Sequence, residues 1–253
     1  VVASQATDDT EWLAAFFPSW GHNIYPVGNH TKGHEAMVYL TYVIDNYHLL
    51  PDIVIFLHAA RYQWHNDDPL YDNARALSRL QLLYIQKQGY VNLRCAWRPG
   101  CPSEIRPHEA SVGALSDKFG MRTGPFFAGA FRELLPELTV PEDVGVGCCA
   151  QYAVSRQQVL KRPLEDYERF RRWLAETELE SSISGRIFEY MWHVLYGKKA
   201  VHCPKARDCY CRTYGLCDLE CHEPGACDSH PFPKSSMLPA GWPWYGWQGE
   251  WQN

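Results

Sequence analysis

The apolar run IVIFL, residues 53–57, constrains the fold of this chain more than any other segment. Five consecutive apolar residues predict a strand that is covered on both faces. Amphipathic helices are predicted on either side of it, over Glu35–Tyr47 and Asn73–Lys87, because apolar residues recur there at the three–four spacing of a helix. Strands and helices that alternate in this way are typical of an α/β fold, with a mostly parallel sheet flanked by helices.

The rest of the chain contains further regular elements and one long loop-rich segment. Strands are expected at residues 1–4, 22–28, 89–97 and 150–155, and helices at 162–176 and 184–196. Residues 98–147 are rich in Pro and Gly and have a helical pattern only at 129–135. Such a long loop-rich stretch inside a compact domain is more often functional than idle. We expect an α/β domain over residues 1–200 and a stapled Cys-rich and Trp-rich extension over 201–253.

The cysteines indicate how that extension is held together. Six of the ten lie between Cys203 and Cys227, in a segment too poor in aliphatic residues to form its own core. Either disulfides or zinc bound by Cys and His could stabilise it, and the absence of a Cys-x-x-Cys pair favours disulfides. The cysteines expected in disulfides are Cys95, Cys101, Cys148, Cys149, Cys203, Cys209, Cys211, Cys217, Cys221 and Cys227.

Several features favour a secreted protein or one in the lumen of the secretory pathway. Disulfides persist in oxidising compartments, and Asn29-His30-Thr31 is an acceptor for glycosylation at Asn29. No apolar stretch reaches the length of about 18 residues that a membrane span needs. The chain begins at Val1 without Met, which leaves room for a removed signal peptide or N-terminal anchor. A net charge of −5 without a long basic run argues against a nucleic-acid partner.

The first candidate site follows the predicted strand at 53–57. Its residues are His58, Arg61, His65 and Asn66, and ligands of open α/β sheets bind at the carboxyl ends of strands. Arg61 could hold a phosphate through two parallel hydrogen bonds, and His58 or His65 could bind a metal ion or transfer a proton. The alternative is a structural histidine followed by a solvated loop.

Two further clusters could carry chemistry. Lys32 and Glu35 lie at a predicted helix N-terminus, which favours an anion, although Glu35 could simply complement the helix dipole. Glu189 and His193 are four residues apart and share one face of a predicted helix, as a base with its partner or as a structural pair. The motifs of zinc proteases, serine hydrolases and P-loop nucleotidases are absent from the sequence.

Five segments of the chain resemble a largely fungal family known as domain of unknown function 3431. They are VVASQATDDTEWL, KGHEAMVYLTYVIDNYHLLPDIVIFLHAARYQWHND, CCAQYAVSRQQVLKRPLEDYERFRRWL, SGRIFEYMWHVLYG and HCPKARDCYCRTYGLC. The layout of that family is in turn similar to glycosyltransferases of the GT-A type. The first segment resembles their opening nucleotide-binding strand, and residues 150–170 with 185–197 resemble the acceptor half of polysaccharide and mucin-branching transferases.

This resemblance implies a sugar nucleotide as donor and a carbohydrate or glycoconjugate as acceptor. Glu189 matches the helix glutamate that deprotonates the acceptor hydroxyl, His193 would orient it, and Lys32, His58 and Arg61 would line the donor site. Where metal-dependent members carry Asp-x-Asp, this chain has His58-Ala59-Ala60-Arg61. The missing Asp-x-Asp leaves two possibilities. Either the enzyme works without a metal ion, with Arg61 and Lys32 balancing the charge of the diphosphate, or the protein is not a glycosyltransferase.

Two alternatives to a glycosyltransferase remain open. One is a metal-dependent enzyme or metal-binding protein that uses His58 and His65, with a divalent metal ion as cofactor. The other is a non-catalytic secreted module that binds glycans. Residues 242–253, WPWYGWQGEWQN, are expected to pack across the body of the domain, and a sugar-stacking platform is the functional alternative for this segment.

Overall fold

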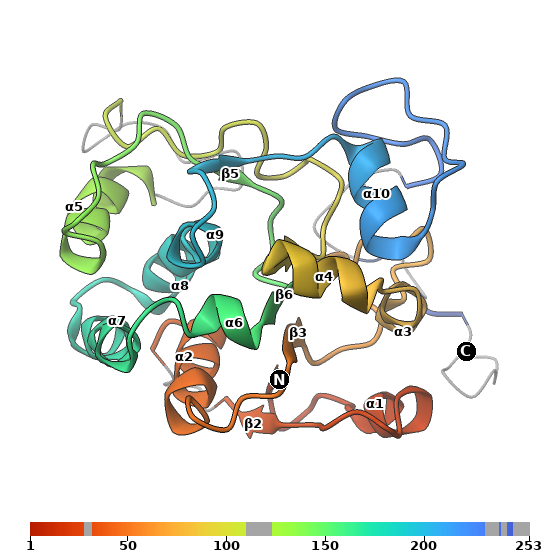
Figure 1. Ribbon diagram of the computed structural model, residues 1–253, viewed down its shortest axis with the longest axis horizontal. Helices are drawn as coiled ribbons and strands as arrows, with labels where there is room; N and C mark the ends of the chain where they lie inside the picture. The colour runs from red at the N-terminus through yellow and green to blue at the C-terminus, as the bar shows by residue number, and fades with distance from the viewer. Residues whose placement is uncertain (28–31, 110–122, 231–237, 239–241, 245–253) are drawn as a thin grey trace.

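The computed structural model describes residues 1–27, 32–109, 123–230, 238 and 242–244. A central sheet has the strand order β2-β1-β3-β6-β4, and β5 pairs with β7 in a separate small sheet (Figure 1). The strands are β1 (Val2–Ser4), β2 (Ile24–Pro26), β3 (Ile53–His58), β4 (Tyr90–Asn92), β5 (Gly145–Val146), β6 (Tyr152–Ser155) and β7 (Val201–His202). The predicted strand at 89–97 is therefore shorter than expected.

The central sheet is mixed. Strands β2, β1 and β3 are parallel, whereas β6 runs antiparallel to both β3 and β4, with Val54 opposite Val154. A parallel neighbour needs a crossover connection, but a periodicity of two residues does not encode strand direction. The α/β class is thus confirmed, and the sheet contains one antiparallel strand that the sequence pattern did not indicate.

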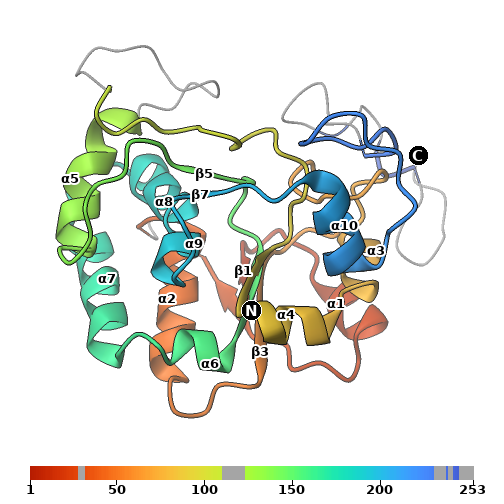
Figure 2. The same ribbon diagram turned by 45° about the horizontal axis from the view of Figure 1, so that its top comes forward.

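Helices cover both faces of the sheet (Figures 1 and 2). They are α1 (Glu11–Phe16), α2 (Glu35–Asp45), α3 (Asn73–Ser78), α4 (Leu82–Gln88), α5 (Gly124–Leu134), α6 (Arg156–Val159), α7 (Leu164–Glu176), α8 (Ser181–Glu189), α9 (Trp192–Leu195) and α10 (Ala206–Tyr214). One core lies under α2, α5, α7, α8 and α9, and the other under α1, α3, α4 and α10. Val54 and Phe56 face the first core, and Ile55 and Leu57 face the second. Burial on both faces explains why this strand is entirely apolar.

Two predicted helices are each divided in the structure. The helix expected over 73–87 is interrupted at Gln81, whose backbone leaves the helical conformation and donates its N–H to the carbonyl of Thr213. The helix expected over 184–196 ends at Glu189, and α9 begins at Trp192. Residues 190–192 are buried one after another, whereas a regular surface helix buries one face. Glu189 and His193 therefore belong to different helices, and the predicted shared face is wrong.

All ten cysteines form disulfides, which confirms the preference for disulfides over zinc. Cys95–Cys209 and Cys101–Cys203 join the segment after β4 to the C-terminal region, while Cys211–Cys217, Cys221–Cys227 and the adjacent pair Cys148–Cys149 are local. Five disulfides indicate an oxidising environment of the secretory or extracellular kind. In the described part of the chain, no helix is long and apolar enough to cross a membrane.

The C-terminal region packs on the α/β body. Tyr210 and Tyr214 of α10 are buried in the second core, and the Tyr210 hydroxyl donates to Asp67 at 2.8 Å. Trp242 contacts Tyr71 and donates its indole N–H to the carbonyl of Leu70 at 3.1 Å. The division into domains at residue 200 stays a prediction. Asn29 and most of the aromatic segment 242–253 lie outside the described residues.

Candidate functional site

A cleft of about 430 Å³ lies at the carboxyl end of β3. The elements that form it are the start of α2, the end of β3, the residues before β6 and the end of α8. Four of the predicted site residues line it, namely Glu35, His58, His65 and Glu189. Because they come from distant parts of the sequence, the fold has collected two carboxylates and two imidazoles at the edge of the sheet where α/β proteins bind ligands.

Glu35 and His58 form an ion pair in this cleft. Glu35 is the first residue of α2 and His58 the last of β3, with 3.3 Å between Oε1 and Nδ1. The other ring nitrogen of His58, Nε2, lies 2.7 Å from the carbonyl oxygen of Cys149, so that both nitrogens face acceptors. An imidazole with two acceptors is best satisfied when both nitrogens are protonated. The geometry therefore favours the imidazolium form of His58 beside the Glu35 carboxylate.

The pKa values of this pair follow from the same geometry. Burial alone would raise the pKa of Glu35, but the hydrogen bond and positive charge of His58 outweigh burial and lower it to about 2. Burial likewise opposes the charged form of His58, yet Glu35 and the Cys149 carbonyl raise its pKa above the ordinary value. Glu35 is thus more than a first-turn acid, since it holds the charge of the imidazole that ends β3.

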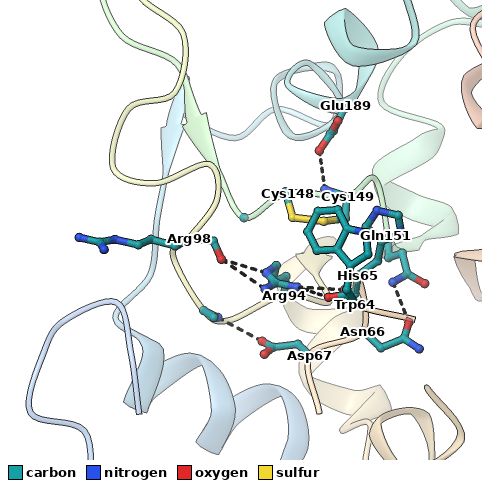
Figure 3. Close-up of a disulfide and its surroundings, with 12 residues drawn as sticks. Trp64, His65, Asn66, Asp67, Arg94, Arg98, Cys148, Cys149, Gln151 and Glu189 are labelled. Atoms are coloured by element: carbon teal, nitrogen blue, oxygen red, sulfur yellow. Dashed lines mark hydrogen bonds between the residues drawn. A yellow bond between two sulfur atoms is a disulfide. The ribbon is translucent and has the colours of Figure 1, made fainter. Parts of the chain in front are cut away.

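His65 is the neutral member of the cluster. Its ring stacks on that of His58, with 4.6 Å between the centroids and 22° between the planes. Burial, together with the charges of His58 and Arg94, lowers the pKa of His65 to about 2. The buried Arg94 side chain also donates to the carbonyls of Trp64 and His65 and so fixes the loop that carries them (Figure 3). Neither Arg94 nor Trp64 belongs to a recognised motif, so residue type and spacing do not single them out.

Glu189 lies at the end of α8 with its carboxylate held on two sides. Oε1 accepts a hydrogen bond of 2.6 Å from the backbone N–H of Cys149 (Figure 3), and Oε2 lies 3.7 Å from Arg186. Arg186 is buried and also contacts Glu104 at 3.2 Å, so its charge is shared between two carboxylates. Burial raises the pKa of Glu189, although Arg186 and the Cys149 amide favour the charged form. A carboxylate with a raised pKa in a cleft is suited to accept and return a proton.

The Cys148–Cys149 disulfide forms part of the cleft wall beside Trp64 (Figure 3). Cys149 and Ala150 have φ values of +87° and +50°, in the left-handed region that favours glycine. His34, another residue of the wall, has φ +52°, so that three of the four described non-glycine residues with positive φ line this cleft. Such conformations cluster at functional sites. The one sequence signal for this feature was the adjacency of two cysteines just before a strand.

Arg61 and Asn66 do not line the cleft, and both have structural contacts. Arg61 makes a two-point ion pair with the buried Asp72, at 2.8 Å and 2.6 Å, and its guanidinium lies over the ring of Phe16. The Asn66 amide donates to the carbonyls of Arg61 and Tyr71, and Asn66 is 3% exposed. The segment after β3 is therefore a hydrogen-bonded, partly buried loop, unlike the solvated loop of the alternative interpretation.

His193 and Lys32 are also absent from the described lining of the cleft. His193 is fully buried, and its Nε2 lies 2.9 Å from the carbonyl oxygen of Ala200. Burial lowers the pKa of His193 to about 4, so this imidazole is neutral and donates to that carbonyl. Because the helix ends at Glu189, His193 contacts the chain near β7 and does not orient the carboxylate.

The contacts of His58 and His65 bear on the metal-site alternative. Both nitrogens of His58 already face acceptors. The rings of His58 and His65 are stacked, so the lone pairs of their nitrogens lie in nearly parallel planes and do not converge on one metal ion. Among the described residues, neither histidine belongs to a group of three or more His, Cys, Asp or Glu side chains with ligand atoms within 4.8 Å of one another. In this arrangement the two imidazoles do not present a shared set of metal ligands.

Comparison with known proteins identifies a family without an assigned activity. No curated protein and no solved structure matches the chain. A family model described as a protein of unknown function, DUF3431, matches residues 1–212. The match spans every element from β1 to most of α10, including all of the residues that line the cleft. The chain therefore belongs to the DUF3431 family.

Proposed function

We propose that this protein is a glycosyltransferase-like enzyme of the secretory pathway or extracellular space, in which Glu189 is the general base. The observation that carries the proposal is that a carboxylate with a raised pKa shares one cleft with an ion-paired carboxylate and imidazolium at the carboxyl end of β3. Glu189 would take the proton of an acceptor hydroxyl as the hydroxyl oxygen attacks the sugar. The acceptor is a carbohydrate or glycoconjugate.

The supporting residues have distinct roles in this proposal. The Cys149 N–H fixes one oxygen of Glu189, and Arg186 stabilises its charged form before the acceptor binds. The Glu35–His58 pair places a carboxylate and an imidazole at the edge of the sheet, and Trp64 supplies an apolar surface on which a sugar ring can stack. The donor that we propose, a sugar nucleotide, rests on the resemblance of sequence segments to GT-A enzymes.

One feature of the cleft favours a second candidate, glycoside hydrolysis. Among the described lining residues, the only Lys or Arg is Arg186, which contacts Glu104 and Glu189, while the charge of His58 is matched by Glu35. Few positive charges are thus left for a diphosphate. The opposite shifts in the pKa values of Glu35 and Glu189 also resemble the division between base and acid in enzymes that hydrolyse glycosides. In that reaction Glu189 would protonate the leaving oxygen.

The test compares donors and a matched pair of variants. Disulfide-intact protein is incubated with a panel of sugar nucleotides plus oligosaccharide acceptors, and separately with glycosides, and products are identified by mass spectrometry. Glu189→Gln keeps an oxygen that can accept from Cys149 but cannot take up a proton at neutral pH. We expect it to lower turnover about 100-fold or more. Glu178→Gln, a change at an exposed glutamate between α7 and α8, should leave turnover unchanged.

The outcomes separate the candidates. Transfer from a sugar nucleotide that requires Glu189 supports the transferase, and hydrolysis of a glycoside that requires Glu189 supports the second candidate. Full activity of the Glu189→Gln variant contradicts both roles of this residue. Glycan binding without turnover by the wild-type protein would instead identify a non-catalytic binding module.

A further inference from the structure

The Cys148–Cys149 disulfide differs from the other four in what it can stabilise. Cys95–Cys209 and Cys101–Cys203 close loops of more than 100 residues, and the two C-terminal disulfides close loops with a separation of six. A disulfide between adjacent residues closes no loop of the chain and so restricts the unfolded state very little. Its effect must therefore be local, on the peptide unit that it spans and on the groups around that unit.

The groups around it are Glu189, the proposed general base, and His58. The N–H of Cys149 donates to Glu189 at 2.6 Å, and the carbonyl of the same residue accepts from His58 at 2.7 Å. In the conformation that makes both bonds Cys149 has a positive φ, which a residue with a Cβ rarely adopts unless its surroundings impose it. The covalent ring formed by the two side chains is the constraint nearest to that backbone.

We propose that the Cys148–Cys149 disulfide is a positioning element of the cleft, which holds Cys149 so that its amide orients Glu189 and its carbonyl orients His58. This inference rests on the proposed function, in which Glu189 exchanges a proton with substrate. It also makes the site sensitive to redox conditions, because opening the S–S bond releases the backbone that connects the two side chains.

The opening reaction needs a dithiol as reductant. One thiolate of the dithiol attacks a sulfur of the pair and forms a mixed disulfide, and the second thiol resolves it. Two electrons and two protons pass to the protein, which gains two thiols, and the reductant becomes a cyclic disulfide. Both sulfurs of the intact disulfide lie within 4.8 Å of a carboxylate oxygen of Glu189, so the reaction takes place beside the group that it affects.

The expected consequence is a change in the proton affinity of Glu189. The charged groups that face it are Arg186 on the same helix, Glu35 on α2 and His58 on β3. Burial raises its pKa and the Cys149 amide opposes that rise, so loss of this hydrogen bond removes a contact that favours the carboxylate. The pKa of Glu189 should therefore rise further when the disulfide is opened.

The test measures that pKa without relying on activity. Side-chain carbon NMR of glutamate-labelled protein, with Glu189 assigned through Glu189→Gln, is followed against pH in oxidised protein, dithiol-treated protein and the C148S/C149S variant. Differential alkylation and mass spectrometry establish which cysteines are reduced. The C211S/C217S variant removes another local disulfide, outside the cleft, and should give the wild-type value. If the C148S/C149S variant does not fold, the dithiol-treated protein carries the test.

A second measurement distinguishes this inference from the proposed function. If oxidised protein is active, opening the disulfide should lower kcat/KM on the order of 100-fold and move the acidic limb of its pH profile to higher pH, and reoxidation should restore both. An upward pKa shift without activity in any state would leave the positioning role standing and refute the function. An unchanged pKa and pH profile after the bond is opened would refute the positioning role.

Discussion

The two long-range disulfides should stabilise the fold in a non-additive way. Cys95–Cys209 spans 114 residues and Cys101–Cys203 spans 102, and the second span lies within the first. When either bridge is intact, the other closes only the 12 residues by which the two spans differ. Chain entropy gives about 3 kcal/mol for closing a loop of that size and about 5 kcal/mol for one of roughly 100 residues.

Replacing one pair of cysteines by alanine should therefore lower the free energy of unfolding by about 3 kcal/mol, and replacing both pairs should lower it by about 8 kcal/mol. The double removal thus exceeds the sum of the single removals by about 2 kcal/mol, because the last bridge to be lost is the one that closes the long loop. Cys95 and Cys209 are also buried in the second core, so their replacement adds the small cost of a cavity.

Equilibrium unfolding in urea, followed by tryptophan fluorescence, measures these free energies. The C211A/C217A variant is the matched control, since it opens a separate loop of six residues and should cost about 2 kcal/mol whichever long-range bridge is present. Additive losses from the two long-range bridges, within about 0.5 kcal/mol, would refute the argument from nested loops.

Two further predictions test how individual site residues were assigned. Arg61→Met should lower the free energy of unfolding by about 3 kcal/mol, because it removes the ion-pair partner of the buried Asp72 carboxylate. In urea titrations, adding Asp72→Asn to the same chain should recover part of this loss. An Arg61→Met variant with wild-type stability and weakened ligand binding would instead indicate that Arg61 belongs to the donor site. The pKa of His65 is about 2 in the folded chain and ordinarily 6.5, so below pH 6.5 the unfolded chain binds a proton at this residue and the folded chain does not. The free energy of unfolding should therefore decrease from pH 6.5 to pH 4.5, and it should decrease less in the His65→Gln variant. Equal slopes of unfolding free energy against pH in the two proteins would contradict the buried, neutral state of His65.

The site residues that can be predicted from the sequence lie at the ends of regular elements. His58 follows a strand whose apolar run indicated burial on both faces, and Glu35 begins a helix whose spacing was regular. Glu189 was singled out by its spacing from His193 and then by its resemblance to a catalytic helix glutamate, and it does line the same cleft. Local periodicity indicates that such elements exist, because neighbouring residues determine it, although several of the predicted ends were wrong.

The incorrect assignments depended on hydrogen-bond partners that residue type does not specify, or on an interrupted helix. Arg61 was expected at the donor site, but Asp72 holds it in the loop after β3. His193 was expected beside Glu189, yet the chain leaves the helix after that residue and the imidazole binds the Ala200 carbonyl instead. Neither outcome follows from residue type and spacing, since both depend on which buried groups find hydrogen-bond partners after the chain has packed.

By itself, the sequence determined that this is an α/β protein with a buried central strand, stabilised by disulfides and carrying acids and imidazoles at the ends of its elements. These properties follow from apolar periodicity, cysteine content and residue type, which are encoded over short stretches of chain. The tertiary structure decided which of those groups meet. The carbonyl of Cys149 lies against His58 from 91 positions away, and its amide lies against Glu189 from 40 positions away. Contacts across such separations depend on strand order and direction, which local patterns do not encode.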